Sequence, residues 1–94
     1  GNSGEGESMI DKVIVNFDQL TTGARVDIAL VDNGGNSLYS DTISYANDGA
    51  VTQKIFYPNV RAKNFRIEID FSNGSTTNPV KIRSIYIVGH TIEI

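Results

Sequence analysis

Apolar and polar residues alternate with a period of two along most of the chain. The clearest run is residues 65–71, where Phe and Ile hold the odd positions and Arg, Glu and Asp the even ones. A period of two places alternate side chains on opposite faces of a β-strand, whereas a helix repeats every 3.6 residues. We therefore expect a strand here that puts four large apolar side chains on a core face.

The same alternation predicts further strands before and after this one. They cover about residues 10–17, 25–30, 37–45, 51–57 and 80–88, with a short segment at 91–94. Within 80–88 the alternation changes phase near Ser84, which predicts a β-bulge or a strand buried on both faces. Pro58 has no amide hydrogen, so the strand before it ends there or lies at a sheet edge.

Two segments rich in Asn, Asp and Gly separate these strands, at residues 32–36 and 47–49. Such residues tolerate the positive φ angles that tight turns need. No segment shows a helical period. About six to eight short strands without helices predict an all-β fold, an antiparallel two-sheet β-sandwich of jelly-roll or immunoglobulin-like type, with a small barrel as the alternative.

The chain has 94 residues, which fits a single domain. Residues 1–8 are small, polar and acidic, so we expect a disordered tail, a linker or a leftover of cloning there, followed by one domain at 9–94. No apolar run approaches the ~20 residues that span a bilayer, so no membrane insertion is expected. The net charge of −3 argues against nucleic-acid binding, which needs a basic excess.

The residues offer little catalytic chemistry. His90 is the one histidine, and the sequence places neither a nucleophile nor an orienting carboxylate beside it. Glu68 and Asp70 share a strand face about 7 Å apart, but any amphipathic strand produces this spacing. Pairing with Arg66 on an outward face explains all three. We expect no enzyme, no catalytic residue and no cofactor.

Loop oxygens are the other candidate for chemistry. Asp32, Asn33 and Asn36 in one turn, or Asn47 and Asp48 in the next, are residue types that can bind calcium. The calcium-loop spacing D-x-[DN]-x-[DN]-G is absent, and tight turns require these same residues. We therefore assign no metal site, while calcium binding in these loops stays an open question.

The tyrosines are the best candidates for a binding surface. A tyrosine ring can stack on a sugar or anchor a protein interface, and its hydroxyl adds a hydrogen bond. Tyr39 and Tyr45 are expected on one strand face, with Tyr57 at the end of the next strand. Asp32 or Asn33 could hydrogen-bond sugar hydroxyls beside them. The alternative is structural packing, since aromatic residues favour strands.

Two segments resemble a known family. Residues 56–69 read Phe-Tyr-Pro-Asn-Val-Arg-Ala-Lys-Asn-Phe-Arg-Ile-Glu-Ile, and residues 80–87 read Val-Lys-Ile-Arg-Ser-Ile-Tyr-Ile. They resemble the closing strands of β-sandwich domains in tailed-bacteriophage virion proteins, particularly tail or neck components. The start of the chain, with Gly23 and Ala24 between two strands, is similar to the start of such domains. Over residues 9–90 the resemblance implies a non-enzymatic structural domain of a virion. It would mediate assembly with other virion subunits or with itself, or attachment to a host surface.

The closing segment also resembles galactose-binding-like jelly rolls of the discoidin and carbohydrate-binding kind. The matching residues are Phe56, Pro58, Ala62, Lys63, Phe65, Arg66 and Ile67, followed by Ile82, Ile85, Ile87 and Gly89. The chain is shorter than that family's usual domain and lacks the tryptophans that often line its sugar sites. This resemblance implies the alternative function: an extracellular or cell-surface carbohydrate-binding module that uses Tyr39, Tyr45 and Tyr57.

Overall fold

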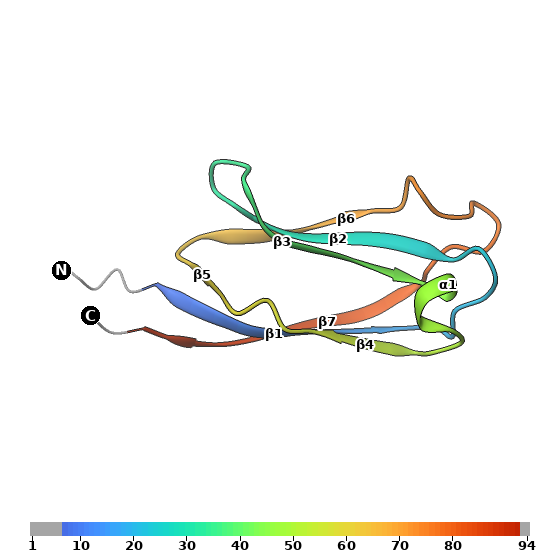
Figure 1. The fold of residues 1–94 in the computed structure, drawn as a ribbon, viewed down its shortest axis with the longest axis horizontal. Coiled ribbons are helices and arrows are strands. Elements are labelled where there is room, and N and C mark those ends of the chain that lie inside the picture. Colours follow the sequence, from blue (N-terminus) through green and yellow to red (C-terminus); the bar gives the residue numbers. More distant parts are fainter. Residues whose placement is uncertain (1–6, 93–94) are drawn as a thin grey trace.

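The computed structural model describes residues 7–92, which form two antiparallel sheets packed face to face (Figure 1). Within this range the elements are β1 (Ser8–Phe17), β2 (Arg25–Asp32), β3 (Ser37–Ser44), α1 (Tyr45–Asp48), β4 (Gln53–Phe56), β5 (Val60–Ala62), β6 (Phe65–Asp70) and β7 (Ile82–Thr91). The predicted all-β class is confirmed, and the arrangement is consistent with a β-sandwich.

Each sheet has one central strand. In the first sheet, β7 pairs along one side of β1, while β4 and β5 pair one after the other along its other side. In the second sheet the order is β3-β2-β6. Strand β3 lies over β4, because the Tyr39 and Phe56 rings meet edge to face at a centroid distance of 6.2 Å. Strand β6 therefore lies over β7, and the sandwich has two long lateral sides, which we call the β3–β4 side and the β6–β7 side.

The core between the sheets is built from the alternate side chains that the sequence pattern predicts. Its buried apolar residues are Ile10, Val13, Val15, Phe17, Leu20, Ala24, Val26, Ile28, Leu30, Ile43, Phe56, Ala62 and Val80. Most of them come from the two central strands, which have neighbours on both sides and a facing sheet. Burial of this apolar surface is the main force that holds the two sheets together.

Strand β7 contains the predicted bulge. Asn16 of β1 pairs with Ser84 and Phe17 pairs with Ile82, so Arg83 is the additional residue. The bulge returns Ile82 to the core face, and Arg83 points out to Asp18, to which it donates two hydrogen bonds of 2.7 Å. The alternative prediction, a strand buried on both faces, is wrong, because the outer face of β7 is exposed.

Residues 45–48 form a turn of helix, where the sequence predicted strand and then a tight turn. The Ser44 hydroxyl accepts a 3.1 Å hydrogen bond from the Asn47 amide, and the Asp48 carboxylate accepts one of 3.1 Å from the Ser44 amide. These caps satisfy backbone groups at the helix start. The chain uses this turn to cross from β3 in one sheet to β4 in the other, so the two strands form no hairpin.

The first strand begins earlier than the sequence predicted. Ser8, which the expected tail included, pairs with Ala62 on one side and with Thr91 on the other. The Glu7 carbonyl accepts a 2.8 Å hydrogen bond from the Ile92 amide. The remaining residues of the expected tail, 1–6, lie outside the described residues, as do residues 93–94 at the chain end. None of the helices described between residues 7 and 92 has the length and apolar character to cross a membrane.

Candidate functional site

The β3–β4 side of the sandwich is closed by a lysine that points inward. Lys54 pairs in register with the fully buried Val15, so its side chain lies on the core face of β4. Its ammonium donates to the Thr42 carbonyl at 2.8 Å, across to the other sheet, and lies 2.9 Å from the Asp48 carboxylate. It also lies 5.4 Å from the centroid of the Phe56 ring, within the range of a cation–π interaction.

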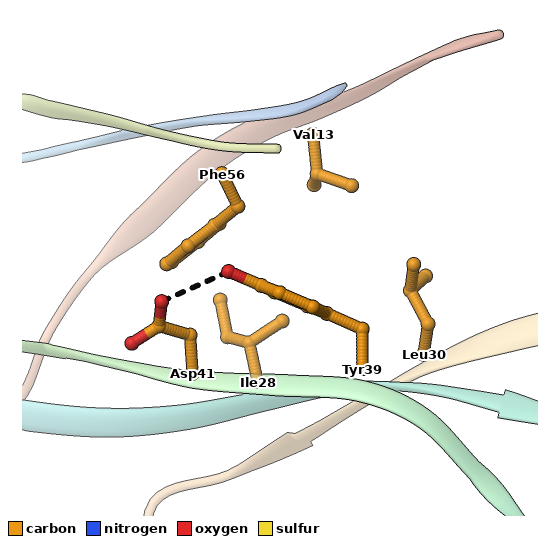
Figure 2. A pocket seen from close by; sticks show the side chains of 6 residues that line it. All are labelled: Val13, Ile28, Leu30, Tyr39, Asp41 and Phe56. Carbon is orange, nitrogen blue, oxygen red and sulfur yellow. Dashed lines mark hydrogen bonds between the residues drawn. The ribbon is translucent and has the colours of Figure 1, made fainter. Parts of the chain in front are cut away.

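Figure 2 shows the neighbouring part of the same side, where Tyr39 and Asp41 of β3 point toward Phe56 of the opposite sheet. The Tyr39 hydroxyl donates a 3.0 Å hydrogen bond to Asp41. Burial raises the pKa of Tyr39, and the hydrogen bond and negative charge of Asp41 raise it further. The cavity between these side chains has a volume of about 10 Å³, which holds one water molecule at most.

Both edge strands of the β3–β4 side therefore carry an inward-pointing charge, Asp41 on β3 and Lys54 on β4. Strands β4 and β5 are also short, and the buried Pro58 separates them. The prediction that Pro58 ends a strand or lies at a sheet edge is confirmed. Short strands, proline and inward charges are the devices by which proteins prevent another strand from pairing with a sheet edge. This side is protected.

On the β6–β7 side, none of the inward residues of β6 and β7 is charged, and the β-bulge of β7 lies near the start of that strand, at Arg83. The inward residues of β6 are Phe65, Ile67 and Ile69, with Phe71 just beyond the strand. Phe65 and Ile67 are half-buried, but Ile69 is 39% exposed and Phe71 is 47% exposed. The apolar face of β6, which the sequence predicts to be buried along its whole length, is therefore covered only at Phe65 and Ile67. Because β6 and β7 are both edge strands, neither has a neighbour that shields its inward side chains from the side.

Strand β7 forms the other margin of this side. Its residues 84–89, Ser-Ile-Tyr-Ile-Val-Gly, contain no charge and no proline. The inward Ile87 is 40% exposed, although its register partner Val13 is buried. Within residues 7–92, no strand pairs with the free edge of β6 or of β7. A long edge of this composition is the kind that pairs with another chain.

An open groove of about 230 Å³ lies at one end of the β6–β7 side. Phe65 of β6 and Ile87 and Gly89 of β7 line it together with Ile10 of the core, and the polar residues Ser8, His90 and Thr91 complete the lining. The groove confirms that the two edge strands face each other without filling the space between them. Exposed apolar surface gathered in one place marks an interaction site more often than single exposed residues do.

The predicted ligand residues Asp32 and Asn33 lie at the β2–β3 hairpin, where they line an open polar groove of about 270 Å³. The Asp32 carboxylate accepts hydrogen bonds of 2.9 Å from the amides of Asn36 and Gly34. These bonds, that from the Asn36 amide foremost, lower the pKa of Asp32. The predicted turn is confirmed, and Gly35 has the positive φ of 84° that such a turn requires. The carboxylate of Asp32 therefore stabilises the turn between β2 and β3.

The three candidate tyrosines do not gather around this groove. Tyr39 packs inward on β3, and Tyr45 begins α1 at the far end of that strand. Eight residues of β3 separate the hairpin from Tyr45, a span of roughly 25 Å at 3.3 Å per residue. Tyr57 is 62% exposed and follows β4 in the other sheet. The structure therefore brings Asp32 and Asn33 together but leaves the tyrosines at separate places.

The groups considered for catalysis have structural partners. Arg66 donates a 2.9 Å hydrogen bond to Glu68 on the outward face of β6, and Asp70 accepts from the Ser72 amide at 2.8 Å. His90 lies in β7, with its Nδ1 2.9 Å from the Asp11 carboxylate. The described residues contain no group of three His, Asp or Glu side chains that could hold a metal ion.

The architecture defines the class of the molecule as a small all-β protein with two antiparallel sheets. No family model, no curated protein and no solved structure matches the chain. The exposed residues of the β6–β7 side, Ile69, Phe71 and Ile87, were not singled out from the sequence as functional. The available signal was the uncharged stretch at residues 84–89, but its apolar pattern equally fits a strand inside a sheet.

Proposed function

We propose that this domain is a non-enzymatic structural and interaction module of a phage virion protein, from the tail or neck, and that its β6–β7 side binds a neighbouring protein subunit during assembly. The observation that carries the assembly role is the contrast between the two lateral sides. One side is closed by inward charges at Asp41 and Lys54, and the other exposes Ile69, Phe71 and Ile87 beside two unpaired strand edges.

An unpaired edge offers backbone amides and carbonyls at the spacing that an added β-strand needs. The apolar side chains beside it supply the surface that becomes buried when a partner docks. The virion assignment is supported by the resemblance of residues 56–69 and 80–87 alone. These segments cover β5, β6 as far as Ile69 and β7 as far as Ile87, so they include most of both strands of the β6–β7 side.

Photo-crosslinking tests this function. A photoreactive amino acid replaces Tyr86, which is exposed on β7, in the particle or cell where the chain is naturally made. The matched control replaces Ser40, an exposed residue on the protected edge strand β3. We expect protein crosslinks from position 86, identified by mass spectrometry, and few from position 40. Equal yields, or none from either position, would contradict the proposed function.

Carbohydrate binding is the second candidate. The observation that favours it is the open polar groove lined by Asp32, Asn33 and Arg61. Among the residues described between 7 and 92, none that lines this groove is aromatic, so these residues offer no ring on which a sugar could stack. Glycan-array binding that depends on Asn33 or Tyr57 would favour this second function over assembly.

A further inference from the structure

We propose that the partner of the β6–β7 side is a second copy of this chain, joined by antiparallel pairing of β6 with β6 across a two-fold axis at Ile67. The inference rests on the proposed assembly function and names its partner. The two copies would then share one continuous six-stranded sheet, in the order β3-β2-β6-β6-β2-β3.

The charges of β6 determine this register. In an antiparallel pair centred on one residue, side chains at equal distances from the centre lie opposite each other. Centring on Ile67 places Arg66 of each copy opposite Glu68 of the other. Because Arg66 and Glu68 already form an ion pair within each copy, the four charges would alternate in sign around a square. Opposite charges across paired strands stabilise the pairing, and like charges destabilise it.

Neighbouring registers are less favourable. Centring on Arg66 places Arg66 opposite its own counterpart, and centring on Glu68 does the same for Glu68. In the register centred on Ile69, Glu68 of each copy lies opposite Asp70 of the other, so two pairs of like charges meet. In the Ile67 register Asp70 lies opposite Asn64, so no like charges meet along the strand. Of the registers compared, the one centred on Ile67 is therefore the only one that pairs Arg66 with Glu68 in both directions and brings no like charges together.

The apolar side chains fit the same arrangement. The inward row then places Phe65 of one copy opposite Ile69 of the other, which covers one of the exposed residues of β6. A two-fold axis perpendicular to the sheet keeps inward side chains inward in both copies. The same rotation turns the free edge of β7 toward its counterpart, and residues 84–89 bring no charge into that space.

Reversing the charges tests the register directly. Arg66→Glu gives a chain with two acidic residues at the centre, and Glu68→Arg gives a chain with two basic residues. Both side chains are about half exposed, so both variants are expected to fold. Sedimentation velocity on the purified 94-residue chain is expected to show that each variant dimerises at least ~10-fold more weakly than the unchanged chain. Ser40→Glu, on the other edge of the same sheet, is the control and leaves dimerisation unchanged.

A mixture of the two variants gives the most specific test of the register. In the Ile67 register, each acidic residue of the Arg66→Glu chain lies opposite a basic residue of the Glu68→Arg chain. We therefore expect the 1:1 mixture to form a heterodimer with the affinity of the unchanged chain. A mixture that associates no better than its components overturns the register. Unchanged dimerisation in both single variants also overturns it.

A strict monomer at concentrations up to about 1 mM, where even a weak dimer is detectable, overturns the second-copy proposal. The assembly function is tested separately, by the photo-crosslinking experiment. Crosslinks from position 86 to a different protein would leave that function intact. The absence of every crosslink from position 86, whether to a second copy or to another protein, would remove both proposals.

Discussion

The Lys54 ammonium lies 2.9 Å from one oxygen of the Asp48 carboxylate and 3.1 Å from the other, and this pair joins β4 of one sheet to the helical turn that follows β3 of the other. Both side chains are largely buried. Asp48 also accepts from the Ser44 amide, so one carboxylate caps the helix and holds the lysine. The pair fixes the β3–β4 side in its closed form.

Replacing Lys54 with Met is expected to lower the free energy of unfolding by about 1.5–3 kcal/mol, because it removes hydrogen bonds to charged and backbone groups in a partly buried place. Urea denaturation measures the change. Arg61→Met is the control, since Arg61 lies 3.8 Å from Glu7 and both side chains are exposed. Exposed pairs contribute little, so the control is expected to stay close to the unchanged chain. Equal losses in the two variants would contradict this account of Lys54.

The stability of the fold is expected to depend on Asp27 in a pH-sensitive way. The Asn73 amide and the Thr42 hydroxyl donate to its carboxylate at 2.9 and 2.7 Å, and they lower the pKa of Asp27. The folded chain therefore binds this proton less readily than the unfolded chain. The contribution is complete above the ordinary Asp pKa of about 3.9 and is lost as the pH falls through the folded-state value.

Asp27→Asn is accordingly expected to destabilise the fold at pH 7 and to have little effect in strong acid, where the carboxylate of the unchanged chain is also protonated. Denaturant titrations at both pH values check the difference. The same loss of stability at both values would show that the charge of Asp27 makes no contribution.

Gly89 lies where β7 passes close to β1. A Cβ atom at this position would lie 2.5 Å from the Met9 carbonyl oxygen, a backbone atom that cannot turn aside. Gly89→Ala is expected to cost about 1–3 kcal/mol, the usual range for overpacking. Gly34→Ala is the matched control, because the nearest atom there is the side-chain nitrogen of Asn36, at 3.2 Å. Thermal unfolding that ranks the two variants in the opposite order would contradict this prediction.

Asp41 is expected to keep the edge of β3 from pairing. It points inward beside the buried Ile28, its register partner. Asp41→Val removes this charge and gives β3 an uninterrupted apolar face, so we expect new association through the β3 edge. The double variant Asp41→Val and Ile87→Lys isolates this effect, because Ile87→Lys blocks association through the β6–β7 side. We expect light scattering to show that the double variant still associates, through the edge of β3. A monomeric double variant would show that Asp41 does not protect the edge.

Much of the fold could be predicted from the sequence because the alternation of side chains determines which face of a strand is buried. The phase change near Ser84 even located the bulge that turns Arg83 outward. The helical turn was missed, since Tyr45 continues the apolar pattern of β3. The signal for it was Ser44, a capping residue, with Asn47 and Asp48 one turn later.

The candidate site could not be predicted in the same way. Alternation says which face a side chain occupies, but not whether its strand has neighbours on both sides. Ile28 and Ile69 are direct partners with the same pattern, yet Ile28 is buried at the centre of a sheet and Ile69 is exposed at its edge. Strand order arises from long-range pairing, so the open and closed sides emerge only in three dimensions.

We expect the chain to associate through its β6–β7 side and not through its β3–β4 side. Sedimentation velocity over a concentration series distinguishes the two sides when Ile87→Lys is compared with Ser40→Lys. We predict that the unchanged chain and Ser40→Lys associate alike, while Ile87→Lys, folded by circular dichroism, stays monomeric at every concentration. Association that Ile87→Lys leaves unchanged, or that Ser40→Lys abolishes, would contradict the claim.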